Sequence, residues 1–162
     1  MHTHVSSFVL EEHSFSACFP VVIPNKPPLV VRDAPPQQVY FRKGEEVTLK
    51  CAFEGGSDVN GVFWFNEENT LIPLIFENPH CESCDLDPTV PKDGALRTAP
   101  VRVYSYQKRV SCSNLLSHFI SELIIDTRRV NISAGATYTC SGMYQYGTSI
   151  SYRTSLWTRE GA

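Results

Sequence analysis

The most informative stretch of the chain is Glu46–Phe53, which reads EVTLKCAF. Apolar residues occupy every second position from Val47 onward, and polar residues alternate with them as far as Lys50. Successive side chains of a β-strand point to opposite faces, so this alternation predicts a strand with one buried face. Cys51 belongs to the apolar set, which places it in the expected core.

Strand-like segments recur along the rest of the chain and are separated by turn signals. A Gly- and Asp-rich turn over residues 54–60 follows the first strand. No segment shows the spacing of a long amphipathic helix. Many short strands with turns between them predict an all-β sandwich or barrel. The further strands are expected at residues 29–32, 61–66, 101–110, 119–126, 136–143 and 151–158.

The 162 residues divide into a lead-in and one domain. Residues 1–36 hold six prolines, which exclude a helix, and we expect a poorly structured segment there. Residues 37–160 carry the strand pattern and form the domain. Within it, about residues 77–112 form a long cysteine-bearing insertion, because no periodicity survives over residues 77–100.

Charge and cysteine content narrow the class of function. The formal net charge of −3 leaves no basic stripe, so we set a nucleic-acid partner aside. Six cysteines in a chain of this size are typical of the secretory pathway, where they form disulfides. Asn131 begins an Asn-Ile-Ser glycosylation sequon, which agrees with that compartment. No run of about 18 apolar residues could span a bilayer, so a leader and any membrane anchor would lie outside this chain.

Four residues of the domain occur in an order that resembles the immunoglobulin superfamily. Cys51 lies on the first strong strand, Trp64 follows on the next, and Tyr138 and Cys140 form a Tyr-x-Cys motif near the start of a late strand. The resemblance covers about residues 37–160 and rests on the order and spacing of these motifs. It implies an immunoglobulin-like two-sheet Greek-key sandwich, here with a long inserted loop.

The resemblance also implies a role for each of these residues. Cys51 and Cys140 would form a disulfide between the sheets, Trp64 would pack on this bond, and Tyr138 would form the tyrosine corner. One departure from the family is Ala134, which stands where an aspartate usually pairs with an arginine across the floor of the sandwich. We therefore expect that ion pair to be missing and the domain to differ from a typical variable set.

The other four cysteines have more than one interpretation. Cys112 is expected to bond Cys81 or Cys84 and pin the insertion to a strand, and the remaining cysteine would pair with Cys18. The Cys-x-x-Cys at 81–84 could be a redox pair, but its acidic, proline-rich surroundings would raise the thiol pKa. His80 with Cys81, Cys84 and Cys112 would make a Cys3His zinc set, which an oxidising compartment disfavours. We expect disulfides, with no metal and no cofactor.

Catalytic motifs are sparse in this sequence. It contains no Gly-x-Ser-x-Gly and no glycine-rich loop of the kind that cradles phosphates. The histidines in the domain, His80 and His118, have no Ser or Asp partner by motif. We expect that the protein is not an enzyme.

A protein-binding face is predicted from the strand that carries the tryptophan. Because that tryptophan points to the core, Phe63 and Phe65 must point outward. The neighbouring strand, which pairs with it in the family fold, adds Met143, and the turn after it adds Tyr144 and Tyr146. Exposed aromatic and methionine side chains are typical of protein interfaces. The alternative is that the insertion covers the two phenylalanines internally.

The sequence therefore predicts an extracellular or cell-surface recognition module that binds a protein, as in an adhesion molecule, a receptor ectodomain or a secreted immune-type protein. The partner would be a protein ligand or another immunoglobulin domain, and a homodimer is a further candidate. The alternative function is a structural spacer in a larger ectodomain. A spacer would keep the Phe63 and Phe65 side chains covered, whereas a binding module would expose them.

Overall fold

The computed structural model describes residues 29–81, 94–111, 116–145, 147 and 149–159. These residues form nine strands and one short helix. In chain order the elements are β1 (Val30–Asp33), β2 (Gln38–Phe41), β3 (Glu46–Gly55), β4 (Val59–Phe65), β5 (Leu74–Ile75), α2 (Gly94–Arg97), β6 (Val101–Ser111), β7 (Leu116–Asp126), β8 (Ala136–Tyr144) and β9 (Ser149–Thr158).

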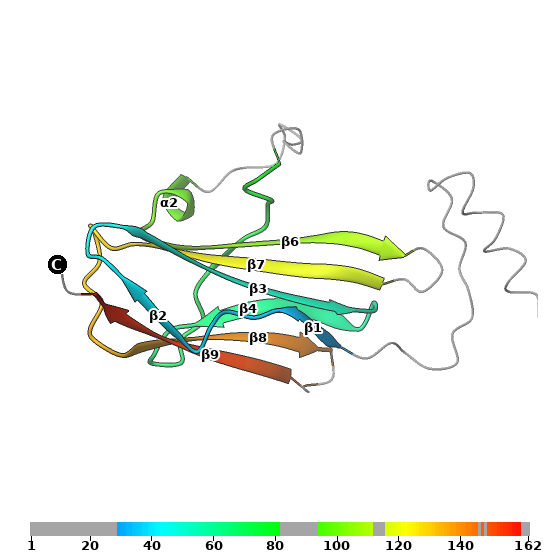
Figure 1. Ribbon diagram of the computed structural model, residues 1–162. Helices are drawn as coiled ribbons and strands as arrows, with labels where there is room; N and C mark the ends of the chain where they lie inside the picture. Colours follow the sequence, from blue (N-terminus) through cyan, green and yellow to red (C-terminus); the bar gives the residue numbers. More distant parts are fainter. Residues whose placement is uncertain (1–28, 82–93, 112–115, 146, 148, 160–162) are drawn as a thin grey trace, which may run out of the picture.

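The strands form two sheets packed face to face (Figure 1). The first sheet, which we call sheet A, has the order β1-β3-β7-β6-β5, and the second, sheet B, has the order β2-β9-β8-β4. Neighbouring strands are antiparallel, except that β2 runs parallel to β9 and β5 runs parallel to β6. This architecture confirms the predicted all-β two-sheet sandwich.

The core lies between the sheets and is built around one disulfide. Cys51 on β3 and Cys140 on β8 are bonded, with their Cα atoms 6.6 Å apart. Trp64 on β4 is the neighbour of Cys140 in the sheet and is fully buried, as is Phe53 on β3. A Cβ atom at Gly142 would approach the Phe53 ring to 2.9 Å, so this position of β8 has room only for glycine. The disulfide and the buried tryptophan confirm the expectations for these residues.

The first strand lies within the segment that the sequence assigns to the lead-in. β1 pairs with β3, and Val31 lies opposite Phe53. Leu29, just before β1, is part of the buried core. A four-residue strand is too short to show alternation, and the prolines on either side of it dominate the local pattern. Residues 1–28 of the predicted lead-in lie outside the described residues.

The region assigned to the insertion contains a full strand of sheet A. β6 pairs with β7 from Val101, opposite Ile125, to Ser111, opposite Leu116. The short helix α2 precedes it and lies on the outside of sheet A, above β6 and β7 (Figure 1). Among the described residues, no helix has the length and apolar character needed to cross a membrane.

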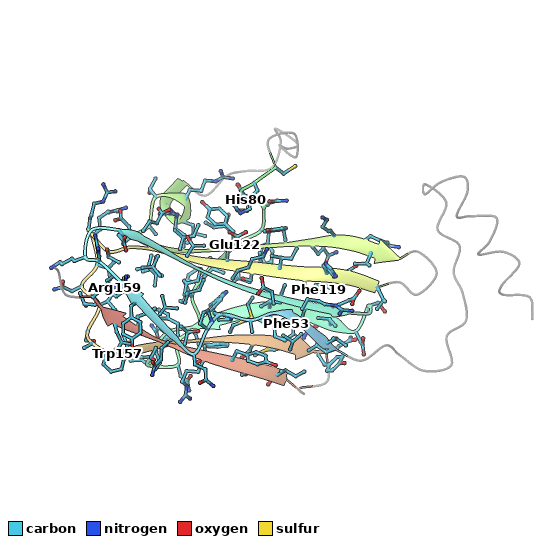
Figure 2. All side chains as sticks on the ribbon, viewed as in Figure 1. Phe53, His80, Phe119, Glu122, Trp157 and Arg159 are labelled. Atoms are coloured by element: carbon cyan, nitrogen blue, oxygen red, sulfur yellow. A yellow bond between two sulfur atoms is a disulfide. The ribbon has the colours of Figure 1, made fainter. Side chains whose placement is uncertain are left out.

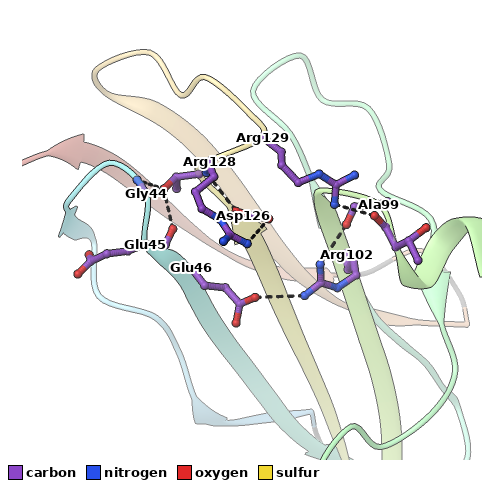
Figure 3. A network of polar contacts seen from close by, with 10 residues as sticks. Gly44, Glu45, Glu46, Ala99, Arg102, Asp126, Arg128 and Arg129 are labelled. Carbon is purple, nitrogen blue, oxygen red and sulfur yellow. Dashed lines mark hydrogen bonds and ion pairs between the residues drawn. The ribbon is translucent and has the colours of Figure 1, made fainter.

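Polar contacts hold together the corner where β3 begins and β7 ends (Figure 3). The hydroxyl of Thr127 donates to the Glu45 carbonyl at 2.6 Å and accepts from the Gly44 amide at 2.8 Å. Asp126 accepts a hydrogen bond from the Arg128 guanidinium at 3.1 Å. This hydrogen bond lowers the pKa of Asp126 below its ordinary value, because it favours the charged carboxylate.

Two further arginines join the same corner to the segment before β6. Arg102 lies 3.4 Å from the Glu46 carboxylate and donates to the Ala99 carbonyl at 3.1 Å. Arg129 donates to the Thr98 carbonyl at 2.8 Å. The end of the insertion is therefore fixed to the sheet by backbone carbonyls that accept from charged side chains.

Candidate functional site

The outward side of sheet B is the candidate binding surface, and we call it the recognition face. Alternation along each strand defines its members, because Trp64, Cys140 and Leu156 all point to the core. Sheet register then places Phe63 beside Ser141, and Ser141 beside Ser151. The face consists of Gln38 and Tyr40 from β2, Phe63 and Phe65 from β4, Thr137, Thr139, Ser141 and Met143 from β8, and Ser149, Ser151, Arg153, Ser155 and Trp157 from β9.

Hydroxyl and aromatic side chains make up most of the recognition face. Arg153 is its single charged member among the described residues. At its centre the hydroxyls of Ser141 and Ser151 are 2.6 Å apart and hydrogen-bonded to each other. At one end Tyr40 and Trp157 are partners in the β2–β9 register, and both are exposed. Surfaces with so little charge are typical of the central parts of protein interfaces.

The two predicted phenylalanines lie on this face, and both are half-buried. Met143 is also half-buried and lies opposite Gly61 on β4, two positions before Phe63. Phe65 forms an isolated bridge with Leu71, so the chain that follows β4 covers part of this end. The structure thus brings Phe63, Phe65 and Met143 onto one side of the sheet, as the parity argument expects.

The tyrosines of the predicted site lie elsewhere. Tyr144 directly follows Met143 in β8, so it points to the opposite side of the sheet, where it packs against the core. Its hydroxyl accepts a hydrogen bond from the Leu29 amide. Tyr146 lies outside the described residues. Tyr138 is half-buried against the core, and burial, followed by the nearby carboxylates of Glu67 and Glu68, raises its pKa.

The outward side of sheet A, which we call the charged face, carries a polar cluster that the sequence does not predict. Glu122 on β7 is only 4% exposed. His80 Nε2 lies 2.7 Å from one of its carboxylate oxygens, and the Tyr106 hydroxyl donates to the same oxygen at 2.8 Å. Burial, followed by this hydrogen bond, raises the pKa of Tyr106. Figure 2 shows His80 on the outer side of the β6–β7 layer, near Glu122.

A second buried carboxylate lies at the other end of the charged face. Glu54 on β3 is bound by the Arg32 guanidinium from β1, and His118 Nε2 lies 3.6 Å from its other oxygen. Glu54 and His118 are opposite one another in the β3–β7 register. Glu54 and Glu122 therefore both have partners from neighbouring strands or from the insertion, as buried charges require.

The zinc alternative is not supported by the placement of its described ligands. His80 directs its Nε2 atom at Glu122, and Cys81 is disulfide-bonded. Neither atom is therefore available as a ligand here. Cys18, Cys84 and Cys112 lie outside the described residues, so the expected pairing of Cys112 with Cys81 or Cys84 stays a prediction.

The sequon lies in the turn between β7 and β8. Asn131 and Ser133 are exposed there, so the turn would give a glycosylating enzyme access to the asparagine. Its modification stays a prediction. The turn is at the far end of the molecule from Met143, so a glycan on Asn131 would leave the Phe63 end of the recognition face open.

Solved structures that resemble this chain are composed of immunoglobulin domains. The N-terminal eight Ig domains of Down Syndrome Cell Adhesion Molecule (DSCAM) isoform 1.30.30 match with a TM-score of 0.51 and 18% identity over 83% of this chain and 13% of that one. The N-terminal Ig1-2 module of Drosophila receptor protein tyrosine phosphatase DLAR matches with a TM-score of 0.46 and 16% identity over 83% of this chain and 50% of that one. Murine CRIg matches with a TM-score of 0.40 and 12% identity over 82% of this chain and 99% of that one.

These similarities concern the fold, because the sequence identities are low. This chain spans half or less of the DSCAM and DLAR chains that it matches. No protein-family model matches the sequence, and no curated protein is significantly similar to it. The sheet order, the Cys51–Cys140 bond and the buried Trp64 agree with the structural match and confirm the predicted immunoglobulin-like sandwich.

Proposed function

Because this chain is an immunoglobulin-like domain, we propose that it is an extracellular recognition module that binds a protein through the recognition face. One observation carries the proposal: Arg153 is the single charged residue within the four strands of sheet B. A sheet face that meets solvent usually carries polar side chains, and on the charged face of this molecule several of these are charged. An outer sheet surface with so little charge and with exposed aromatic side chains favours contact with another protein.

The chemistry of the recognition face supports a partner that is itself mostly uncharged at its centre. Phe63, Phe65 and Met143 supply apolar area at one end, and Tyr40 and Trp157 supply it at the other. Tyrosine and tryptophan offer a large apolar surface together with one polar atom, which suits an interface that forms and separates in water. Another immunoglobulin domain, including a second copy of this one, has the required chemistry.

The Cys51–Cys140 bond supports placement of the protein outside the cell or in the secretory pathway, because such bonds persist in oxidising compartments. The bonded state of Cys81 and the exposed sequon at Asn131 agree with that compartment. A receptor or adhesion role, and attachment to a membrane through a segment outside this chain, belong to the same proposal.

The test introduces one charge at the centre of the recognition face. Ser151 is exposed, so Ser151→Glu should leave the fold intact while placing a carboxylate beside Ser141 and close to Phe63. Thr48→Glu is the matched control, since Thr48 is exposed on the charged face. The wild type and both variants would be measured against an array of purified cell-surface ectodomains that includes the domain itself.

We expect at least one ectodomain to bind the wild type and the Thr48→Glu variant, and to lose binding to Ser151→Glu. The double variant Phe63→Asp/Phe65→Asp should lose the same partner, provided that its circular dichroism spectrum still shows a folded sheet. Failure of this double variant to fold would assign both phenylalanines to the core. Equal binding by Ser151→Glu, or binding to no ectodomain, would favour the spacer function.

A further inference from the structure

The turn that carries the sequon lies against the exposed tryptophan of the recognition face. A Cβ atom at Gly135 would lie 3.1 Å from the Cη2 atom of Trp157, so the far end of the indole ring rests on the Gly135 backbone. Gly135 donates its amide to the Leu156 carbonyl at 2.8 Å, and Ala136 donates to the Ser133 carbonyl at 3.0 Å. Ser133, the last residue of the sequon, is therefore held in one tight turn with the residue that supports the ring. Figure 2 shows Trp157 at the end of the sandwich where the chain passes from β7 to β8.

The packing of Ile132 sets the direction of the sequon. Ile132 is half-buried against the core, whereas Asn131 and Ser133 on either side of it are exposed. Asn131 is four residues before Gly135, which limits the distance between their Cα atoms to at most about 14 Å. An asparagine side chain and the first two sugars of an N-linked glycan together extend across a gap of this size.

Trp157 is held in a fixed orientation on the recognition face. Its Nε1 atom donates to the Ser155 hydroxyl at 3.1 Å. Tyr40, its partner in the β2–β9 register, is 53% exposed, and Trp157 itself is 36% exposed. The side chains of Ser155 and Tyr40 are uncharged. The surface at this end of the face is thus aromatic, neutral and already ordered, so a bound group would meet little entropic cost from the protein.

A sugar ring has the chemistry to pack on such a surface. A pyranose ring presents C–H groups on one side and hydroxyls at its rim, so it can cover an aromatic ring while its polar groups stay in water. The N-acetyl methyl group of N-acetylglucosamine adds apolar area. A glycan on Asn131 is also attached covalently at the same end of the molecule, which gives it an effective concentration that a free partner does not have.

We infer that the N-linked glycan of Asn131 folds back onto sheet B and packs its first two sugars, both N-acetylglucosamine, on the Trp157 indole. The contact covers one end of the recognition face. The inference rests on the proposed function, which places the chain in the secretory pathway. It narrows that function, because it assigns the Trp157 end of the face to the chain's own glycan and the Phe63 end to the protein partner.

The first measurement uses the two tryptophans of the chain, one as a probe and one as an internal control. The protein would be secreted from glycosylating cells with 15N-labelled tryptophan, and peptide mass spectrometry would measure the occupancy of Asn131. It would be compared with Ser133→Ala, which removes the sequon but keeps Asn131 and Trp157. We expect the indole N–H resonance of Trp157 to differ between the two proteins, and that of the fully buried Trp64 to stay in place.

The matched control is Ser133→Thr, which preserves the sequon and should reproduce the Trp157 resonance of the wild type. In both of these glycosylated proteins, nuclear Overhauser contacts should join the Trp157 ring protons to N-acetyl methyl groups. An unmodified Asn131 in the secreted protein would overturn the inference. So would the same Trp157 resonance with and without the sequon, or the absence of these contacts.

The second measurement is a cycle of thermal unfolding experiments. Ser133→Ala should lower the Tm of the secreted protein, and the same change should lower it less in a Trp157→Ser background, because the sugar no longer has a ring to cover. Equal reductions in both backgrounds would show that the glycan acts without the ring and would contradict the inference. If Trp157→Ser does not fold, the resonance comparison decides, since it leaves Trp157 in place.

Ectodomain binding separates this inference from the function on which it rests. Ser133→Ala should bind the same ectodomain as the wild type, whereas Ser151→Glu should not. If Ser151→Glu loses its partner while Trp157 shows no contact with sugar, the glycan inference is wrong and the recognition module stands. If Trp157→Ser in the glycosylated protein loses the ectodomain as completely as Ser151→Glu does, a protein partner covers the ring and the glycan inference is overturned.

Discussion

The two outer faces of the sandwich are built from different kinds of residue. On the charged face β3 carries Glu46, Lys50 and Glu54, and β7 places Asp126 opposite Glu46 and Glu122 opposite Lys50. Most of these charges have a partner in a neighbouring strand, in the insertion or in a turn. On the recognition face a single arginine stands among hydroxyl and aromatic side chains. One face is therefore stabilised by its own polar contacts, and the other, with so little charge, is the face that we propose for binding a partner.

Because of this difference, we expect substitutions on the two faces to have different effects on stability and on binding. Changes on the charged face should lower the free energy of unfolding, because they remove partners from buried polar groups. Changes on the recognition face should leave stability almost unaltered and alter binding. Substitutions can test this difference between the faces, beginning with the Cys51–Cys140 disulfide that joins the two sheets.

The largest effect is expected where the two sheets are joined. The Cys51→Ala/Cys140→Ala variant removes a bond between residues 89 positions apart, and the free energy of unfolding should fall by about 4–5 kcal/mol on the chain-entropy model. Urea denaturation monitored by tryptophan fluorescence measures the loss. A decrease below about 1 kcal/mol would contradict the view that this bond holds both faces in place.

The next effect concerns Glu122, the most buried carboxylate of the charged face. In Glu122→Ala, His80 and the Tyr106 hydroxyl lose their shared partner, and stability should fall by about 1–3 kcal/mol. Glu122→Gln keeps the shape and one acceptor, so it should lose less. Ser149→Ala on the recognition face is the comparison, because Ser149 is exposed, and it should stay within about 0.5 kcal/mol of the wild type. Equal losses on both faces would remove the distinction between them.

A smaller effect separates the two partners of Glu122. Tyr106→Phe removes one hydroxyl donor and should lower the free energy of unfolding by about 0.5–1.5 kcal/mol. His80→Ala should have the smaller effect of the two, because 66% of the His80 side chain is exposed and water can replace it. Thermal unfolding of the two single variants would measure this order, and the reverse order would make His80 the main anchor.

Local signals were sufficient to predict the fold. The alternation around Cys51 is visible within one strand, and the order of Cys51, Trp64 and Cys140 is visible in their spacing. The structure has the disulfide and the buried tryptophan that these patterns predict. A short strand was expected at residues 29–32, where β1 lies, but β2 escaped prediction because a four-residue strand is too short to show a clear period. The departure at Ala134 could be read directly from the sequence, but the contacts of Thr127 with Glu45 and with Gly44 could not, since more than 80 residues separate them.

The candidate site was predictable only where successive residues of one strand point to opposite faces of the sheet. This alternation places Phe63, Phe65 and Met143 on one side of sheet B. Tyr144 lies on the other side, because β8 continues past Met143. The Glu122 cluster depends on His80, which lies in the aperiodic insertion and 42 residues away. Nor does any sequence period report the pocket lined by Phe63, Phe76 and Phe119, which lies near the point where the chain passes from sheet B to sheet A.

The smallest effect is expected at the corner of the charged face, where Arg128 lowers the pKa of Asp126. A carboxyl group whose folded pKa lies below its unfolded value of 3.8 contributes stability above pH 3.8 and loses it as the pH falls through the folded pKa. Arg128→Gln should therefore raise the pKa of Asp126 toward 3.8 and reduce stability slightly at neutral pH, and this difference from the wild type should vanish in acid. The effect is small because 72% of the Arg128 side chain is exposed and screened by solvent. Arg153→Gln is the matched control, because Arg153 makes none of the ion pairs found among the described residues. Carboxyl-carbon NMR titration measures the pKa of Asp126 in the two variants. A rise of this pKa in Arg128→Gln alone keeps the two faces distinct. An equal rise in both variants would show that Arg153, on the recognition face, acts on the charged face as well.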